Sequence, residues 1–325
     1  MTREKSKNKK SGGKTQKQRV HLAYILLTVI IVLITTLILF VPRSEKGSTD
    51  AEEDVTAKPL EPATGEPIAP PPGEPSPDVS EDMEAPKQPS EKPVRGKLYL
   101  VIDDVGYNLE QLDRFLEVPM PITYAILPMI EHTASSRKKI SENGGEIILH
   151  QPIEPLGNED PGPGALYVNM EPEEIQSTIT ANLEQVPEAV GVNNHMGSLG
   201  TSDYTLMESM LREMKQRNPH MFFLDSRTTA DTVAETVAED VQLLHVHRNI
   251  FLDNSTSRED IMAALDEAVK VADEQGYAVM IGHVWCEELA AILPLWYAEM
   301  KEAGYRFDYI SGHFSEGVVR AGNGN

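Results

Sequence analysis

Cysteine is almost absent from this chain of 325 residues, because Cys286 is the only one. A lone cysteine excludes an intrachain disulfide framework and any zinc module built from several cysteines. Positive charge is also scarce, since 29 Lys and Arg stand against 51 Asp and Glu, for a formal net charge of −22. Nucleic acid is therefore an unsuitable partner, because binding to phosphates requires clustered Lys and Arg.

Long uncharged runs are equally scarce, and the one that stands out is residues 20–42, with no Asp, Glu, Lys or Arg. A helix of that length spans roughly 30 Å, the thickness of a bilayer core. The run is longer than the apolar part of a cleaved signal peptide and ends without a small-residue cleavage site. Residues 1–19 carry eight Lys or Arg and one acid. We expect a basic cytoplasmic tail at 1–19 and a transmembrane signal anchor at 20–42, with the rest of the chain outside the cytoplasm.

The next segment, residues 43–95, has no aromatic side chain and few large aliphatic ones. Residues 44–95 hold 11 of the chain's 23 prolines, and 13 acids against five bases. Such a composition cannot bury enough apolar surface to fold, and its Pro-rich runs favour extended polyproline II. We predict a disordered Pro/Glu-rich linker that acts as a semi-rigid stalk, with a Pro-rich ligand for a partner domain as the alternative.

Residues 96–325 alternate short apolar runs with longer amphipathic ones, and no second run long enough to span a membrane occurs there. Near-continuous apolar strands alternating with helices indicate parallel strands buried on both faces. We expect an α/β domain, either a (β/α) barrel or a large open sheet. The predicted strands are 97–103, 122–127, 146–150, 189–193, 221–225, 241–247, 277–282 and a short last one at 306–310. The predicted helices are 109–116, 133–143, 172–185, 204–217, 230–239, 258–275 and 287–303.

Titratable side chains follow six of the first seven predicted strands. The carboxyl ends of parallel strands meet at one edge of the sheet, which is where α/β enzymes hold their active sites. Any one of these residues could be a helix cap or a solvent-exposed loop residue. Their joint occurrence favours an enzyme over a binding module.

Asp103 and Asp104 end the first predicted strand. Adjacent side chains on an extended chain point to opposite sides, so one carboxylate could bind a metal while the other faces a substrate water. A helix cap is the alternative. His150 and His195 each close a later strand, and together with Asp104 they would form a usual catalytic zinc shell with an open position for water. Taken alone, either histidine is more often a structural residue.

His283 follows the strand at 277–282, and Asp225 ends a strand earlier in the chain. A carboxylate that orients a histidine is a frequent catalytic arrangement, although a histidine bonded to a loop carbonyl is as good a reading. Arg227 could neutralise an acid at this edge or pair with a surface Glu. We expect Cys286 to be a packed thiol, because no Lys, Arg or His next to it in the sequence is an obvious activator.

Four stretches of this domain resemble the divergent polysaccharide deacetylase family, over most of residues 97–315. They are Ile102-Asp103-Asp104-Val105-Gly106, His150-Gln151-Pro152-Ile153-Glu154-Pro155, Gly191-Val192-Asn193-Asn194-His195-Met196-Gly197-Ser198 and Phe223-Leu224-Asp225-Ser226-Arg227-Thr228-Thr229. That family is related to NodB-type deacetylases, which remove N- or O-acetyl groups from glycans with a divalent metal held by Asp-His-His. The resemblance implies a distorted (β/α) barrel of seven or so parallel strands.

The resemblance also implies roles for individual residues. Asp103 would be the base and Asp104 a metal ligand, and His283 would be the general acid. Asp225 and Arg227 would be the residues that tune the acid and the base. The related enzymes carry paired histidines four residues apart, whereas this chain reads His150-x-x-x-Glu154, so either His195 or Glu154 supplies the missing ligand. We assign substrate contacts to Glu154 and Asn194.

These inferences predict a membrane-anchored, metal-dependent deacetylase, with zinc as the metal, acting on a polysaccharide of a bacterial cell envelope or periplasm. The altered histidine pair supports a second reading, a non-catalytic glycan-binding or envelope-assembly protein on the same scaffold. Metal-dependent hydrolysis of a phosphate ester fits the Asp and His set but lacks a basic cradle for phosphate. The acidic domain favours a neutral or cationic glycan.

Overall fold

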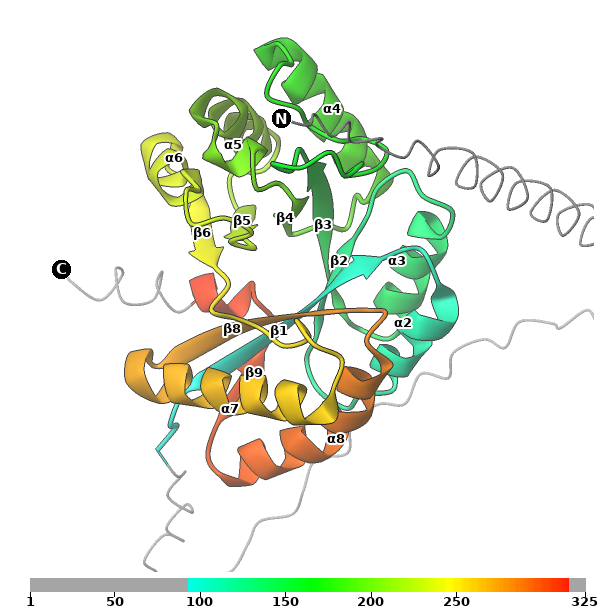
Figure 1. Cartoon of the computed structure of the whole chain (residues 1–325), viewed down its shortest axis with the longest axis vertical. Helices are drawn as coiled ribbons and strands as arrows, with labels where there is room; N and C mark the ends of the chain where they lie inside the picture. The colour runs from blue at the N-terminus through cyan, green and yellow to red at the C-terminus, as the bar shows by residue number, and fades with distance from the viewer. Residues whose placement is uncertain (1–92, 316–325) are drawn as a thin grey trace, which may run out of the picture. The chain divides into compact units, whose positions relative to one another are not determined.

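Nine strands alternate with helices along residues 93–315, the part of the chain that this computed structural model describes (Figure 1). The strands are β1 (Lys97–Val105), β2 (Thr123–Ile126), β3 (Glu146–Ile153), β4 (Gly191–Met196), β5 (Phe222–Asp225), β6 (Leu244–His247), β7 (Ile250–Phe251), β8 (Tyr277–His283) and β9 (Arg306–Asp308). The α-helices are α2 (Leu109–Leu116), α3 (Thr133–Glu142), α4 (Pro172–Gln185), α5 (Tyr204–Arg217), α6 (Ala234–Val241), α7 (Arg258–Gln275) and α8 (Glu287–Glu302).

The basic tail, the anchor and nearly all of the linker predicted from the sequence fall within residues 1–92, outside the described residues, and so do residues 316–325. Within 93–315, no helix combines the length and the apolar character needed to cross a membrane.

All strands of the sheet are parallel, in the order β6-β5-β4-β3-β2-β1-β8-β7, with β9 paired to β1. β6 and β7 follow each other in the chain but lie at opposite ends of this order, so the sheet curls and stays open between them. The helices lie along its outside, with α5 between α4 and α6, and α8 beside α2 and α7 (Figure 1). The predicted α/β fold of parallel strands is confirmed, and it takes the form of an open, curled half-barrel rather than a closed barrel.

The alternation of side chains along each strand separates two apolar layers. In β1, Leu98, Leu100 and Ile102 join the large core between the sheet and the helices. Tyr99 and Val101 join a smaller core on the concave side of the sheet. Both layers are fully buried, which is why the strands read as continuous apolar runs rather than as alternating ones.

The smaller core is closed at the amino ends of the strands by the segment after β9. There, Ile310 and Phe314 pack with the concave side chains, and the ring of Phe314 lies 5.0 Å from that of Phe222. The backbone N–H of Ile310 donates to the Thr123 hydroxyl. Apolar side chains therefore fill the concave side at the amino ends of the strands, and its polar residues gather at the carboxyl ends.

Helix ends follow the capping signals in the sequence. Asn108 accepts hydrogen bonds at the start of α2, and Ser257 accepts one at the start of α7. Gly276 ends α7 with a left-handed φ of 89°, which glycine adopts without strain. Cys286 is buried, as predicted for a packed thiol. Predictions failed at α6, which starts at Ala234 rather than at residue 230, and at β7, which was not predicted.

Candidate metal centre and catalytic site

The backbone of Asp104 departs from a regular strand. Its φ is 61°, in the left-handed region, and the pairing of β1 with β2 shifts register between Ile102 and Val105. This irregularity, a β-bulge, re-aims the side chain. Asp103 and Asp104 therefore both approach His150, with Asp103 Oδ2 at 3.8 Å and Asp104 Oδ1 at 3.3 Å from its Nε2. The expectation that the two carboxylates point to opposite sides was wrong, because it assumed an undisturbed strand.

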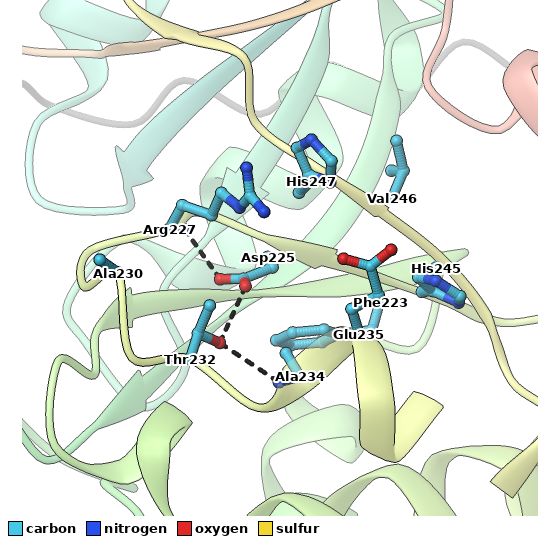
Figure 2. A pocket seen from close by; sticks show the side chains of 10 residues that line it. All are labelled: Phe223, Asp225, Arg227, Ala230, Thr232, Ala234, Glu235, His245, Val246 and His247. Atoms are coloured by element: carbon cyan, nitrogen blue, oxygen red, sulfur yellow. Dashed lines mark hydrogen bonds between the residues drawn. The ribbon is translucent and has the colours of Figure 1, made fainter. Parts of the chain in front are cut away.

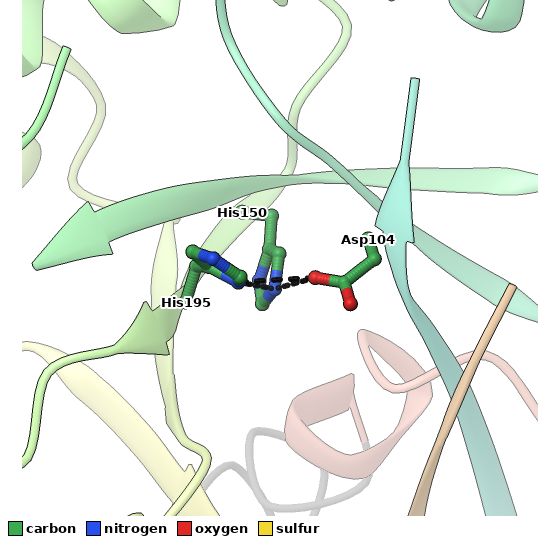
Figure 3. A group of neighbouring side chains, drawn as sticks. All are labelled: Asp104, His150 and His195. Carbon is green, nitrogen blue, oxygen red and sulfur yellow. Dashed lines mark hydrogen bonds and ion pairs between the residues drawn. The ribbon is translucent and has the colours of Figure 1, made fainter. Parts of the chain in front are cut away.

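Asp104, His150 and His195 point toward one common position (Figure 3). Asp104 Oδ1 lies 3.0 Å from His195 Nδ1 and 3.3 Å from His150 Nε2. The two imidazole nitrogens are 3.2 Å apart. Asp104 Oδ1 is buried and receives no hydrogen bond of good geometry from residues 93–315. Three lone-pair donors, one of them this oxygen, fit a divalent cation such as Zn²⁺, which binds Asp and His with bonds of about 2.0–2.2 Å.

Asn193 supports the centre from beneath. Its side-chain oxygen lies 2.8 Å from His150 Nδ1, and its amide donates to Asp103 Oδ1 at 2.8 Å. The carbonyl oxygen can only accept, so His150 carries its proton on Nδ1 and leaves Nε2 free for a metal. All three side chains are almost fully buried, so one amide orients both a candidate ligand and the candidate base.

The charges of this cluster shift its pKa values in different directions. Burial opposes the ionisation of Asp104, but its contacts with His150 and His195 outweigh burial and hold its pKa well below the usual range. Burial of Asp103 raises its pKa, and the charges of His150 and His283 counter this effect only in part. Burial opposes protonation of His150, yet Asp103 and Asp104 raise its pKa above the ordinary value. Asp104 is thus held as a carboxylate, the form that binds a metal.

His283 ends β8 next to Asp103 in the register of the sheet, and Asp253 holds it. Asp253 Oδ1 lies 2.9 Å from His283 Nδ1, while Oδ2 accepts the backbone N–H of His283 at 2.7 Å. Burial opposes protonation, but the bond to Asp253 and that residue's charge raise the pKa of His283 to about 9. The imidazole stacks with the rings of both Phe251 and Trp285, with centroids 5.7 and 5.0 Å away. It is therefore charged near neutral pH and fixed in orientation.

The prediction that Asp225 orients His283 was wrong, because Asp225 lies on the other face of the sheet. Phe223, two residues before it, packs in the core between sheet and helices, and Asp225 shares that face. Its carboxylate accepts bonds from the Arg227 N–H and the Thr232 hydroxyl, at 2.8 and 2.9 Å. Asp225, Arg227 and Thr232 line a cavity of about 70 Å³ near the start of α6 (Figure 2). Arg227 itself is exposed.

The two predicted substrate contacts have structural partners instead. Asn194 is buried, and its side chain joins β4 to the loop after β5 by accepting the Ser226 N–H and donating to the Met196 carbonyl. The Glu154 carboxylate accepts the backbone N–H of Val168 at 2.8 Å. Among the residues that the structure describes, Glu154 is not in the ligand group, so geometry favours His195 over Glu154 as the third ligand.

Sequence reasoning missed four residues of this site: Asn193, Asp253, Phe251 and Trp285. The doubled Asn193-Asn194 at a buried strand end was a usable signal, since a buried amide requires hydrogen-bond partners. Asp253 follows a strand of two residues, β7, which leaves no periodic pattern. Trp285 gave no signal, because an aromatic residue next to a core strand usually packs in the core.

An open half-barrel of parallel strands, with Asp and two His converging at its carboxyl edge, defines a deacetylase-like α/β protein with a candidate metal centre. The chain belongs to the divergent polysaccharide deacetylase family, whose model matches residues 100–313. The resemblance inferred from the four sequence stretches is thereby confirmed.

Relatives share this domain. A Haemophilus influenzae protein is 32% identical over 189 residues, which cover 58% of this chain and 67% of that protein. YibQ of Escherichia coli is 34% identical over 188 residues, which cover 58% of each chain, so the matched part is less than two thirds of YibQ. The crystal structure of ATU2773 from Agrobacterium tumefaciens has a TM-score of 0.60 at 19% identity, covering 67% of this chain and 88% of that one. This last likeness concerns the fold alone.

Proposed function

We propose that this protein is a metal-dependent carbohydrate deacetylase that removes acetyl groups from a cell-envelope polysaccharide. The observation that carries the proposal is the convergence of Asp104 Oδ1, His150 Nε2 and His195 Nδ1 to within 3.3 Å of one another. This group of ligand atoms lies beside Asp103 and the charged His283, in a member of a deacetylase family. That setting supports hydrolysis rather than a purely structural ion.

Asp104, His150 and His195 would hold the metal, which when bound lowers the pKa of water and polarises a carbonyl oxygen. Asp103 lies next to this position, with its Oδ2 3.8 Å from His150 Nε2. Its carboxylate is held on one oxygen by Asn193, which leaves Oδ2 to accept a proton as water attacks the acetyl carbonyl.

His283 supplies the complementary proton. Nδ1 faces Asp253, so Nε2 is the nitrogen that can donate to the departing sugar nitrogen or oxygen. Stacking contacts with Phe251 and Trp285 restrict rotation of the imidazole ring. Because Asp103 and His283 are paired in the register of β1 and β8, a base and an acid on neighbouring strands would flank the acetyl group.

The cellular setting belongs to the same proposal. The uncharged run at 20–42 and the basic residues before it support a signal anchor that places residues 93–315 outside the cytoplasm. An envelope polysaccharide is the substrate that such a location and this family favour. A fusion reporter after residue 43 that is active only in the cytoplasm would contradict this topology.

Glu154 favours a second candidate function, a glycan-binding or assembly protein without catalysis. It occupies the position at which related enzymes carry the second of two paired histidines, and its carboxylate is engaged by backbone. If His195 does not replace that ligand, the scaffold would bind glycan without a working metal.

Metal content and acetate release test the proposal on the purified full-length chain in detergent. We expect one equivalent of metal per chain by elemental analysis, and acetate released from oligomers of N-acetylglucosamine. A chelator should abolish release, and zinc should restore it. His150→Ala and Asp104→Ala should lose metal and activity together.

Two results separate the candidates. A protein that binds oligomers but contains no stoichiometric metal and releases no acetate is the non-catalytic alternative. Normal metal content in both His150→Ala and Asp104→Ala would overturn the ligand assignment. Leu295→Ser, an exposed change on α8, is the matched control and should leave both measurements unchanged.

A further inference from the structure

Large apolar side chains are exposed on four loops at the carboxyl edge of the sheet. Trp285 is 41% exposed after β8, Tyr107 57% after β1, Met129 45% after β2 and Leu156 68% after β3. These four strands are neighbours in the sheet, in the order β3-β2-β1-β8. We name these four residues the apolar rim. One exposed apolar residue is ordinary, but one on each of four adjacent loops at a candidate active site marks a binding surface.

Contacts between the loops place the apolar rim beside the metal centre. The Trp285 indole N–H donates to Asp104 Oδ2 at 3.1 Å. The loops after β1 and β2 are joined by the His132 N–H, which donates to the Gly106 carbonyl at 3.0 Å. The loop after β3 approaches the Tyr107 hydroxyl at Gly162, where an added Cβ would lie 3.9 Å away. The four loops that carry the apolar rim thus form one continuous row, and this row begins beside the candidate metal ligand Asp104.

The charge of these loops restricts what can lie on them. The segments 106–108, 127–132, 154–171 and 284–286 contain five acids and no Lys or Arg. The acids are Glu131, Glu154, Glu159, Asp160 and Glu171. A polyanion would be repelled, whereas a chain of neutral or positively charged groups is compatible with both the acids and the apolar side chains.

We propose that the apolar rim is a binding track for an extended glycan strand of neutral or amine-bearing sugars, a proposal that rests on the proposed function. Three intervals between adjacent strands amount to roughly 14 Å along the edge, which is longer than a single sugar ring. Sugar rings present flat apolar faces that pack on Trp and Tyr, while acids accept hydrogen bonds from their hydroxyl or ammonium groups. The strand enters over Leu156 and reaches the metal centre at Trp285, so the enzyme selects polymers over single sugars.

Oligomers of β-1,4-linked N-acetylglucosamine test this track on the full-length chain treated with a chelator, so that binding is measured without turnover. We expect affinity to rise from the dimer to the hexamer. Leu156→Ser should weaken hexamer binding roughly fivefold and Tyr107→Ser roughly tenfold, while dimer binding changes little. Leu295→Ser is the matched control, because Leu295 is 65% exposed on α8, away from the loops of the rim.

Several outcomes would overturn the track. Equal affinity for dimer and hexamer would do so, and so would Leu156→Ser and Leu295→Ser variants that bind the hexamer alike. Tighter binding of a sulfated oligomer would contradict the charge argument. The test of the binding track can be distinguished from the test of the proposed deacetylase activity. Acetate release with no length dependence refutes the track alone, whereas length-dependent binding without acetate release refutes the enzyme alone.

Discussion

The indole N–H of Trp285 donates to Asp104 Oδ2, while the other oxygen of the same carboxylate contacts His150 and His195. The indole ring also stacks on His283, with centroids 5.0 Å apart and planes inclined by 18°. One side chain therefore touches both a candidate metal ligand and the candidate general acid. Outer partners of this kind orient ligands and contribute to metal affinity.

Trp285→Phe separates these two contacts, because phenylalanine keeps a ring against His283 but has no N–H for Asp104. We expect zinc affinity to fall roughly tenfold, as is usual when a hydrogen bond to a ligand is lost. Isothermal titration calorimetry with zinc checks this on the full-length chain. Trp296→Phe is the control, because Trp296 is buried in the large core on α8, where its ring packs on Phe307. Equal affinities in the two variants would contradict the role of the indole N–H.

Glu154→Gln and His195→Gln distinguish the two residues that the sequence left as candidates for the third ligand. We expect Glu154→Gln to keep its metal, because the Glu154 carboxylate contacts Val168 rather than the centre. His195→Gln should lose most of its metal, because His195 Nδ1 lies 3.0 Å from Asp104 Oδ1. Elemental analysis after dialysis measures both. Metal retained by His195→Gln and lost by Glu154→Gln would reverse the assignment.

The pair of His283 and Asp253 predicts how stability depends on pH. The pKa of His283 is raised from 6.5 to about 9 in the folded protein, so protonation favours the folded state. This contribution, up to about 3 kcal/mol, is fully present below about pH 6.5 and is lost as pH rises through about 9. Denaturant titrations of the chelated protein at both pH values measure it.

His283→Gln is the variant for this test, since glutamine cannot titrate. The difference in its unfolding free energy between the two pH values should be smaller than that of the unchanged protein. Asp253→Asn should reduce the difference in the same way, because the pKa of His283 depends on the Asp253 charge. A difference of the same size in all three proteins would show that other groups cause it.

Much of the fold was predictable, because strands buried on both faces and helices with regular caps leave strong patterns. The bounds of α2, α4, α5 and α7 were predicted to the residue. Asp104, His150 and His195 were also predictable, since parallel strands bring their carboxyl ends to one edge whatever the details of the sheet.

The side to which each residue points was not predictable from the same patterns. A continuous apolar strand does not indicate which of its two alternating sets of side chains faces the concave core, so Asp225 was assigned to the wrong face. The left-handed backbone of Asp104 depends on tertiary contacts, and no local signal marks it. Asp253 was missed because it follows a strand too short to show alternation.

Asn193 provides a last test, against its neighbour Asn194 on the other face of β4. Asn193→Ala removes the partner of both His150 and Asp103, so two buried groups lose a hydrogen bond. We expect stability to fall by about 1–3 kcal/mol and zinc affinity by roughly tenfold or more. Asn194→Ala should lower stability by a similar amount, because it removes bonds to Ser226 and Met196, yet change zinc affinity little.

Denaturant unfolding and zinc titration of the two variants separate orientation of a ligand from general support of the strand. If Asn193 acts through His150, its variant loses zinc affinity beyond what its loss of stability explains. If both variants lose affinity equally, β4 as a whole positions His195, and the amide of Asn193 has no particular part. Asn193→Gln cannot replace this comparison, because an extra methylene in a fully buried position would disturb the packing around His150.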